Sequence, residues 1–351
     1  MGFSMPAEWE PHQATWIAWP HNLRDWPGRF GPVPWVFADI VKKLAEGEIV
    51  RLLVNDAAHQ ARARRHLERH GANLDRVDFR RIPTDRVWTR DSGPIVVRKG
   101  GPGGGRAVAG FRFDAWSKYP DWKRDARIPE RAARAIGLSV VPVRRDGHDV
   151  VLEGGAIDVN GAGSILATEE CLLDPAVQVR NPGFGRMDYE KVFGAALGAP
   201  NTIWLGKGIA GDDTHGHVDD LARFVSPSTI VLAREDDPRD ANHRPLSENR
   251  ERLASARLPD GARPEVVDLP MPRPVTFAGQ RLPASYANFY VANAAVLVPT
   301  FNDPADRQAL GILGELFSDR PVVGIHALDL VWGLGTIHCM TQQEPRDANG
   351  A

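Results

Sequence analysis

Short apolar runs alternate with amphipathic stretches along the whole chain, and the two patterns predict different elements. From Trp35 to Leu44 an apolar residue recurs every third or fourth position, which predicts a helix, and Gly47 follows as a stop. The same spacing predicts further helices over 57–70, 129–136, 189–197, 246–256 and 306–317. Short apolar and β-branched runs predict strands over 15–19, 49–54, 95–97, 108–113, 139–143, 202–205, 265–269 and 322–325.

Several of the expected strands come in pairs. Residues 150–159 and 164–168 are joined at Asn160–Gly161, a dipeptide that favours a tight hairpin turn. Residues 218–225 and 229–233 form a second expected pair. Because such pairs alternate with single helices along the chain, the pattern predicts an α/β fold built from a repeated strand–strand–helix–strand unit.

The composition narrows the class of protein. The chain has 351 residues, enough for one large domain or two smaller ones, and a net charge of −2. This charge gives no reason to expect a nucleic-acid partner. No stretch approaches the roughly 20 apolar residues of a membrane span, and the first residues lack the pattern of a signal peptide. We therefore expect a cytoplasmic protein without a membrane partner.

One of the two cysteines lies in a late stretch, residues 333–343, that is rich in glycine, hydroxyl and amide groups. Gly333 and Gly335 would let a small substrate approach the backbone just before Cys339. Such a cysteine, with histidine and carboxylates elsewhere in an enzyme-sized chain, is a candidate nucleophile. The alternative is an inert core thiol, because free cysteine is often part of a hydrophobic core.

Four further residues stand close to glycine at predicted strand ends: Asp91, Glu153, His217 and Asp219. If residues 213–220 are extended, His217 and Asp219 point to one face, because strand side chains alternate. Each residue also has a purely structural interpretation, such as an ion pair for Asp91, a turn cap for Glu153 or a core histidine for His217.

Together with the thiol, these groups suit the chemistry of a guanidinium group. A guanidinium is planar and cationic, and carboxylates bind it in a bidentate manner, so two aspartates can hold its edges. A thiolate can then attack the central carbon, while a histidine protonates the departing ammonia and later activates water. A glutamate beside the histidine would orient the imidazole.

Six motifs occur in order along the chain. They are Met-Pro-Ala-Glu-Trp-Glu-Pro-His at 5–12, Trp-Thr-Arg-Asp-Ser-Gly-Pro at 88–94, Leu-Glu-Gly-Gly at 152–155, Thr-Glu-Glu-Cys-Leu-Leu at 168–173, Gly-His-Val-Asp at 216–219 and Ile-His-Cys-Met-Thr-Gln-Gln at 337–343. With these motifs the chain resembles the agmatine deiminase family of guanidine-modifying hydrolases, which is related more distantly to bacterial peptidylarginine deiminases. The resemblance covers nearly the whole chain.

The resemblance implies a fold and a set of partners. The implied fold is a five-bladed α/β propeller with pseudo-fivefold ββαβ units, formed by residues 1–351 as a single domain. The implied substrate is a small guanidino molecule, with no cofactor and no metal ion, and a homo-oligomer is compatible with the resemblance.

The resemblance also implies roles for individual residues. Cys339 is the implied nucleophile, His217 the acid and base, Glu153 its partner, and Asp91 with Asp219 the guanidinium clamp. Trp88 would pack on the methylene chain of the substrate, and Asp85 would add negative charge at its far end, whereas Cys171 matches a position with no catalytic role. The implied reaction converts agmatine to N-carbamoylputrescine and ammonia through an amidino group on Cys339, a step of putrescine biosynthesis in polyamine metabolism.

Departures from the family pattern leave the substrate open. Residues 84–87 read Thr-Asp-Arg-Val, where agmatine deiminases usually carry Asn-Asp, and residues 333–336 read Gly-Leu-Gly-Thr in place of Gly-Gly-Gly-Asn. Free or peptide-linked arginine is therefore an alternative substrate, for which Arg86 would supply a cation.

Two other classes of function also stay open from the residues. A metal hydrolase could use His215, His217 and Asp219, whose spacing resembles half of a metal site, although no second ligand cluster with credible spacing accompanies it. A non-catalytic propeller that binds polyamines is the other alternative.

Overall fold

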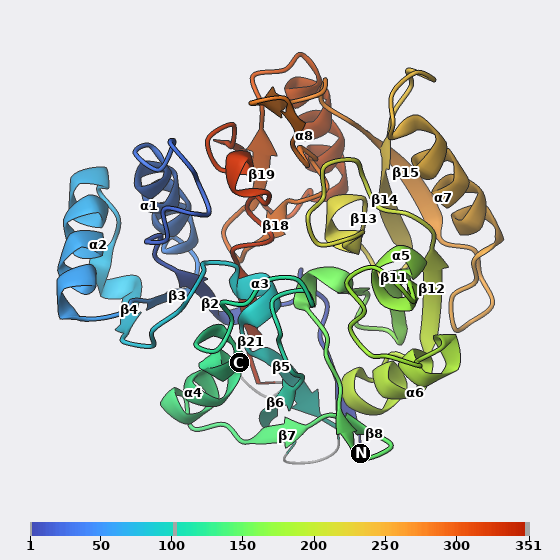
Figure 1. The fold of residues 1–351 in the computed structure, drawn as a ribbon, viewed down its shortest axis with the longest axis horizontal. Coiled ribbons are helices and arrows are strands. Elements are labelled where there is room, and N and C mark those ends of the chain that lie inside the picture. The colour runs from blue at the N-terminus through green and yellow to red at the C-terminus, as the bar shows by residue number, and fades with distance from the viewer. Residues whose placement is uncertain (1, 101–103, 348–351) are drawn as a thin grey trace.

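The computed structural model describes residues 2–100 and 104–347 and has a mixed α/β fold (Figure 1). Within these residues, five sheets share one arrangement. An antiparallel strand pairs with the first strand of a strand–helix–strand crossover whose two strands are parallel. The predicted α/β class is thereby confirmed, and the predicted repeat has a visible counterpart.

Four of these units are continuous in sequence. They comprise β5 (Ile95–Lys99), β6 (Arg106–Gly110), α4 (Ile128–Ala135) and β7 (Val140–Pro142); β10 (Asp158–Val159), β11 (Ser164–Thr168), α6 (Arg186–Leu197) and β12 (Asn201–Leu205); β13 (Ala222–Phe224), β14 (Thr229–Arg234), α7 (His243–Ser255) and β15 (Glu265–Pro270); and β18 (Tyr290–Val291), β19 (Val296–Thr300), α8 (Ala305–Leu316) and β20 (Val322–His326). The short strand β1 (Phe3–Ser4) adds to the edge of the first of them.

The remaining unit joins the two ends of the chain. Its crossover runs through β2 (His12–Ala18), α1 (Val33–Leu44) and β3 (Ile49–Leu53), and α2 (Ala57–His70) leads on to β4 (Val77–Arg80). The antiparallel partner of β2 is β21 (Gln342–Pro345), which begins three residues after Cys339. This pairing brings the segment of the candidate nucleophile to the start of the chain.

Local sequence explains where the helices lie and end. Helix α2 begins where the Asp56 side chain accepts a hydrogen bond from His59 N, and it ends at Gly71, whose φ of +74° favours glycine. Helix α1 buries one face, as its apolar spacing predicts. In Figure 1 the crossover helices lie around the outside of the molecule, with α3 (Thr89–Ser92) nearer the middle.

Two predicted strands are wrong at the site segments. Only Asp158–Val159 of the predicted strand 150–159 is a strand, because residues 154–156 form a 3-10 turn, η3. Residues 218–220 form another 3-10 turn, η4, so 213–220 is not extended. The Asn160–Gly161 hairpin is confirmed. Gly154 explains part of the difference, because a Cβ there would lie 2.2 Å from the carbonyl oxygen of Arg90.

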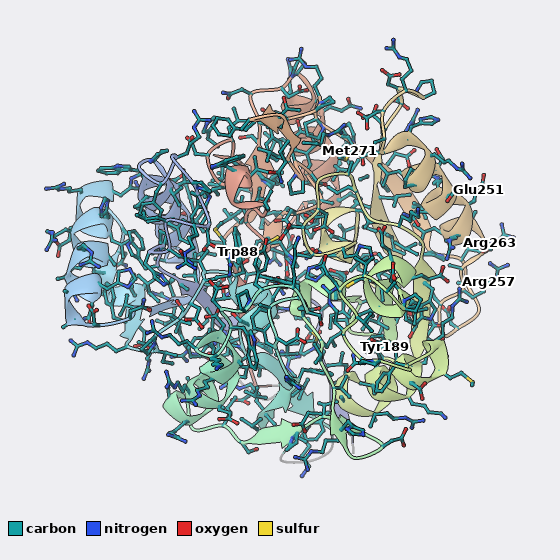
Figure 2. The ribbon with its side chains drawn as sticks, viewed as in Figure 1. Trp88, Tyr189, Glu251, Arg257, Arg263 and Met271 are labelled. Atoms are coloured by element: carbon teal, nitrogen blue, oxygen red, sulfur yellow. The ribbon has the colours of Figure 1, made fainter. Side chains whose placement is uncertain are left out.

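The side chains separate into a packed interior and a polar surface. Figure 2 shows Trp88 well inside the molecule, whereas Glu251, Arg257 and Arg263 project outward near α7. No helix in the described part of the chain combines the length and the apolar character needed to cross a membrane. The strand pairings do not test whether the five units close into a propeller, so that expectation stays a prediction.

Candidate active site

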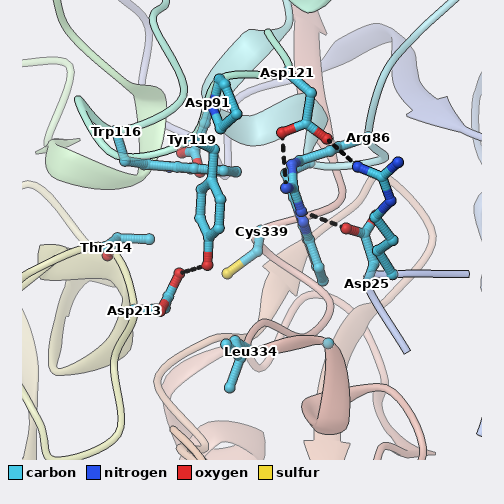
Figure 3. Close-up of a pocket in the computed structure, with 14 residues that line it drawn as sticks. Asp25, Arg86, Asp91, Trp116, Tyr119, Asp121, Asp213, Thr214, Leu334 and Cys339 are labelled. Atoms are coloured by element: carbon cyan, nitrogen blue, oxygen red, sulfur yellow. Dashed lines mark hydrogen bonds and ion pairs between the residues drawn. The ribbon is translucent and has the colours of Figure 1, made fainter. Parts of the chain in front are cut away.

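A pocket of about 290 Å³ lies where the short site segments meet. Three of the predicted site residues line it: Cys339, Asp91 and Trp88. Figure 3 shows the Cys339 sulfur directed into this space, with Trp116 and Asp91 on one side and Arg86 on the other. His217, Glu153 and Asp219 are buried directly behind the lining.

The glycines before Cys339 make room for tryptophan rings. A Cβ at Gly335 would lie 2.8 Å from the Trp88 ring and 3.2 Å from the Cys339 sulfur. A Cβ at Gly333 would lie 2.7 Å from the Trp26 ring. Tryptophan rings thus occupy the space beside both glycines, while Gly333 also lines the pocket, so the expected approach of a substrate to this backbone stays a prediction.

Asn288 holds the segment that carries the nucleophile. Its side-chain oxygen accepts hydrogen bonds from Thr336 Oγ1 at 2.7 Å and from His338 N at 3.1 Å. Its Nδ2 lies 3.1 Å from the Cys339 sulfur and 3.0 Å from Asp220 Oδ1. These contacts fix the sulfur at the base of the pocket.

Asp91 is fixed by two hydrogen bonds. Its Oδ2 accepts from Trp116 Nε1 at 2.9 Å, and its Oδ1 accepts from Gly155 N at 3.0 Å. Burial raises the pKa of Asp91 to about 6; the neighbouring His217 opposes this rise and Asp219 adds to it.

His217 lies between two carboxylates. Its Nδ1 is 3.8 Å from Asp91 Oδ1, and its Nε2 is 3.6 Å from Glu153 Oε2. Burial would lower the pKa of His217, but Asp91, Cys171 and Glu153 together raise it well above the usual range. Burial would likewise raise the pKa of Glu153, but Arg180, 3.2 Å away, and His217 lower it to about 2.

Asp219 approaches the sulfur from the other side. Its Oδ2 lies 4.0 Å from the Cys339 sulfur and 2.6 Å from His338 Nδ1. Burial raises the pKa of Cys339 well above the usual range, and the nearby Asp219, Asp220 and Asp91 add to that rise. The structure thus brings all five predicted catalytic residues together, while their roles remain predictions.

Asp85 does not line the pocket. Its Oδ2 accepts a hydrogen bond from Arg124 N at 2.8 Å, and its Oδ1 is 3.7 Å from Arg124 Nε. Two aspartates that the sequence interpretation missed line the pocket instead, Asp25 and Asp121. They hold Arg86, with Nη1 2.5 Å from Asp25 Oδ1 and Nη2 3.0 Å from Asp121 Oδ1.

The structure does not support a metal site that uses both His215 and His217. His215 Nε2 lies 2.9 Å from Asp174 Oδ2, outside the pocket lining. Within the described residues, two groups have ligand atoms within 4.8 Å of one another: Glu153 with Cys171 and His217, and Asp219 with Asp220 and Cys339. In the first group the Arg180 guanidinium already forms an ion pair with Glu153, and its positive charge disfavours a metal cation there.

Sequence reasoning missed the residues that support the site. Four such residues contact predicted site residues directly: Asn288, Arg180, Trp116 and His338. Glu8 contacts His338 in turn. His338 and Glu8 were within reach, since each lies inside one of the six motifs.

The fold and the site together define a class of enzyme, and comparisons with known proteins agree with it. A buried thiol beside carboxylates and a histidine suits covalent catalysis on a cationic carbon. The family model for Porphyromonas-type peptidyl-arginine deiminase matches residues 4–345. The chain therefore belongs to this family of hydrolases, which act on C–N bonds.

Individual relatives cover nearly the whole chain. The agmatine deiminase of Ectopseudomonas mendocina is 34% identical, over 98% of this chain and 96% of its own. The solved structure of Enterococcus faecalis agmatine deiminase superposes with a TM-score of 0.88 at 29% identity, over 98% of this chain and 96% of that chain. A C. jejuni agmatine deiminase variant with substrate bound superposes with a TM-score of 0.85 at 26% identity, over 98% of this chain and 97% of that chain.

Proposed function

We propose that this enzyme hydrolyses the guanidino group of agmatine, giving N-carbamoylputrescine and ammonia through a covalent intermediate on Cys339. The observation that carries the proposal is the convergence of one sulfur with two carboxylates and a histidine. Asp219 Oδ2 lies 4.0 Å from the sulfur, Asp91 lines the same pocket, and His217 Nδ1 is 3.8 Å from Asp91.

The proposed reaction has two steps. First, the Cys339 sulfur attacks the guanidinium carbon, one bond from this carbon to a terminal nitrogen breaks, and His217 gives its proton to the departing ammonia. Second, His217 takes a proton from water, the water oxygen attacks the amidino carbon, and the sulfur leaves. One water is consumed and one ammonia is released. Nδ1 is the proposed working nitrogen of His217, because Nε2 faces Glu153.

Substrate binding would activate the thiol. In the free enzyme, burial and three aspartates raise the pKa of Cys339, which favours the protonated sulfur. A guanidinium held by Asp91 and Asp219 brings a positive charge to the sulfur and favours the thiolate. The nucleophile would therefore form where its target is already bound.

The charge of the pocket favours agmatine, which carries a cation at each end. The ionisable side chains of the lining include Asp25, Asp91, Asp121 and Asp213, against only Arg24 and Arg86. This excess of carboxylates suits a dication and opposes a substrate with a carboxylate of its own. The relatives named as agmatine deiminases support the same substrate.

Arginine, free or within a peptide, is the second candidate. Arg24 and Arg86 both line the pocket, and either could bind a carboxylate. The family description, which names a peptidyl-arginine deiminase, agrees with this alternative. Against it, Asp25 and Asp121 already neutralise Arg86.

Ammonia release tests the proposal and separates the two candidates. We would compare agmatine, arginine, arginine-containing peptides and 4-guanidinobutyrate at equal concentration. The proposal predicts the highest kcat/KM for agmatine. Activity on none of them would contradict guanidino deimination, and a preference for arginine or its peptides would overturn the substrate alone.

We further propose that residues 1–351 act as one domain in which the five units form a propeller around this pocket. The pairing of β21 with β2 supports the proposal, because the end of the chain returns past the last continuous unit to complete the unit at the start of the chain. Residues 1, 101–103 and 348–351 lie outside the described part of the chain.

A further inference from the structure

His338, the neighbour of the nucleophile, lies between two carboxylates in the interior. Its Nδ1 is 2.6 Å from Asp219 Oδ2, and its Nε2 is 2.8 Å from Glu8 Oε2. The side chain is only 2% exposed, so water does not compete for either contact. An ionised carboxylate can only accept hydrogen bonds, so a ring that serves both partners donates from both nitrogens.

Glu8 is itself immobilised by three other segments. Its Oε1 accepts from Val291 N at 2.8 Å and lies 2.9 Å from Arg223 Nη2. Its Oε2 lies 3.0 Å from Arg90 Nη2. Burial would raise the pKa of Glu8, but Arg223, His338 and Arg90 lower it well below the usual range. The proposed reaction uses no residue of the 5–12 motif. Glu8 of this motif therefore supplies a fixed negative charge beneath the site.

The contact with His338 leaves one oxygen of the clamp free. Asp219 Oδ2 is the atom that His338 holds, whereas Asp219 Oδ1 is buried and has no hydrogen-bond partner among the residues that the structure describes. A buried acceptor without a partner is costly, so an N–H donor of a bound ligand would be favoured at that atom.

We propose that His338 is a positioning residue, which holds Asp219 so that Oδ1 faces the guanidinium, and that Glu8 fixes His338 from behind. The proposal deepens the proposed function and rests on it, because the guanidinium is the ligand that Asp219 would bind. Glu8 contacts His338, His338 contacts Asp219, and Asp219 Oδ2 lies 4.0 Å from the Cys339 sulfur, so Glu8 and His338 act through Asp219.

The environment of Asp219 determines how pH reports on this role. The charged and titratable groups that face Asp219 or lie near it are His338, His217, Arg223, Asp91, Asp220 and Cys339. Burial would raise the pKa of Asp219, and His338 opposes that rise most strongly. Loss of His338 should therefore raise the pKa of Asp219, so that protonation of Asp219 joins that of Asp91 in the acid limb of kcat/KM and moves the limb to higher pH, a change that a merely structural role would not produce.

Two substitutions separate the two contacts of His338. In His338→Asn the amide nitrogen can replace Nδ1 and reach Asp219, whereas in His338→Gln it can replace Nε2 and reach Glu8. We expect His338→Gln to raise KM for agmatine at least about tenfold, with the acid limb shifted upward, and His338→Asn to do less. His215→Asn is the matched control, since His215 also pairs with a carboxylate but lies outside the pocket lining, and it should change neither quantity.

A second readout does not depend on turnover. Alkylation of Cys339 by 2-chloroacetamidine, a cation, and by 2-chloroacetamide, its neutral isostere, releases chloride from each and leaves a thioether. The rate with the cationic amidine divided by the rate with the neutral amide measures how strongly the Asp91 and Asp219 clamp favours a cation. We expect His338→Gln to reduce this ratio at least about tenfold, and Glu8→Gln to reduce it in the same direction by less. Glu8→Gln preserves shape and so serves if the His338 variants fail to fold.

An unchanged ratio and an unchanged acid limb in a folded His338→Gln or Glu8→Gln protein would overturn the positioning role. Failure of the proposed function gives a different result. In that case no guanidino compound is hydrolysed by the unmodified enzyme, while the alkylation ratio still falls on removal of His338.

Discussion

At the scale of single residues, Asp91 combines two tasks that depend on its charge. It lines the pocket as half of the proposed clamp, and it lies 3.8 Å from the proposed acid and base, His217. Both tasks need the ionised carboxylate. Because burial raises its pKa to about 6, we expect kcat/KM to fall as the pH drops through that value.

A substitution at Trp116 can shift the acid limb of kcat/KM without removing a charged side chain. Its Nε1 donates to Asp91 Oδ2 at 2.9 Å, which stabilises the ionised form. Trp116→Phe removes the donor, so the acid limb of kcat/KM should move to higher pH by about 0.5–1 unit. Trp122→Phe is the control, because Trp122 does not line the pocket and should leave the limb in place. An unmoved limb in Trp116→Phe would show that Asp91 does not set it.

Arg86 is the residue at which the choice between the two candidate substrates can be tested, because it lines the pocket and pairs with two of its aspartates. In the unmodified enzyme we expect kcat/KM for agmatine to exceed that for arginine at least about tenfold, which requires about 1.4 kcal/mol of differential transition-state binding. Arg86→Ala removes a cation from the lining and leaves the half-buried Asp121 without this partner, so this ratio should widen further, as paired rate measurements would reveal. Arg124→Ala, which uncovers Asp85 outside the pocket lining, should leave the ratio unchanged. A wild-type preference for arginine that Arg86→Ala selectively destroys would refute the substrate assignment.

At the scale of elements, short turns place the reacting groups. Asp91 lies in α3, Gly155 in η3 and Asp219 in η4. A Cβ at Gly155 would lie 2.5 Å from His217 Nδ1 and 2.8 Å from Asp91 Oδ1. The missing side chain is thus what allows the imidazole and the carboxylate to approach each other.

Gly155→Ala should therefore separate His217 from Asp91. Because a misplacement of about 1 Å can cost about 100-fold, we expect kcat to fall at least that far, measured by ammonia release on a folded protein. The control is Gly311→Ala in α8, where a Cβ would meet no described atom within 4 Å beyond its own helix. That change should keep kcat and add about 0.5–1 kcal/mol of stability. Full activity in Gly155→Ala would mean that the close approach is not needed.

The elements differ in how far the sequence could predict them. Helix α1 has apolar residues at helical spacing, and helix α2 has an N-cap residue and a C-terminal glycine, so both positions follow from local sequence. Turn η3 was mistaken for strand because the apolar run of 150–152 continues in sequence across Gly154 and Gly155. The bend depends on contacts of Gly154 with Arg90, more than sixty positions earlier, which no local pattern records.

At the scale of the whole molecule, the end of the chain completes the unit at its start. Strand β21 pairs with β2, and the fully buried Glu344 lies 2.6 Å from Arg51 Nε and 2.9 Å from Arg106 Nη1. Cys339 lies three residues before this strand. The position of the nucleophile therefore depends on an interaction between distant parts of the chain.

Glu344→Gln tests that dependence. The change removes the charge that both arginines contact, but Arg51 keeps Asp78 and Arg106 keeps Asp347 as partners, so the free energy of unfolding should fall by about 1–3 kcal/mol, measured in urea. Glu315→Gln on the exposed face of α8 should change it by less than about 0.5 kcal/mol. Equal stability of the two variants would refute the importance of this contact.

Contacts between distant parts of the chain also limit how much of the site can be predicted from the sequence. Cys339, His217, Glu153, Asp91 and Asp219 each lie in a short motif with its own chemical signature, so they could be listed beforehand. Asp25 and Asp121 carry no such signature, and only the fold brings them to the pocket in place of Asp85. Supporting residues such as Asn288 are likewise known only from their contacts.

The central claim is that Cys339 forms a bond to the guanidino carbon, and intact mass spectrometry after mixing with agmatine tests it most directly. Because His217 serves both steps of the proposed reaction, the intermediate is trapped by acid quench in the unmodified enzyme during turnover, and in His217→Asn after longer mixing times. The account predicts a mass increase of one agmatine minus one ammonia, located by peptide mapping on Cys339 and not on Cys171, and absent from Cys339→Ser. Turnover of agmatine by Cys339→Ser at the wild-type rate, or an adduct on Cys171 alone, would contradict it.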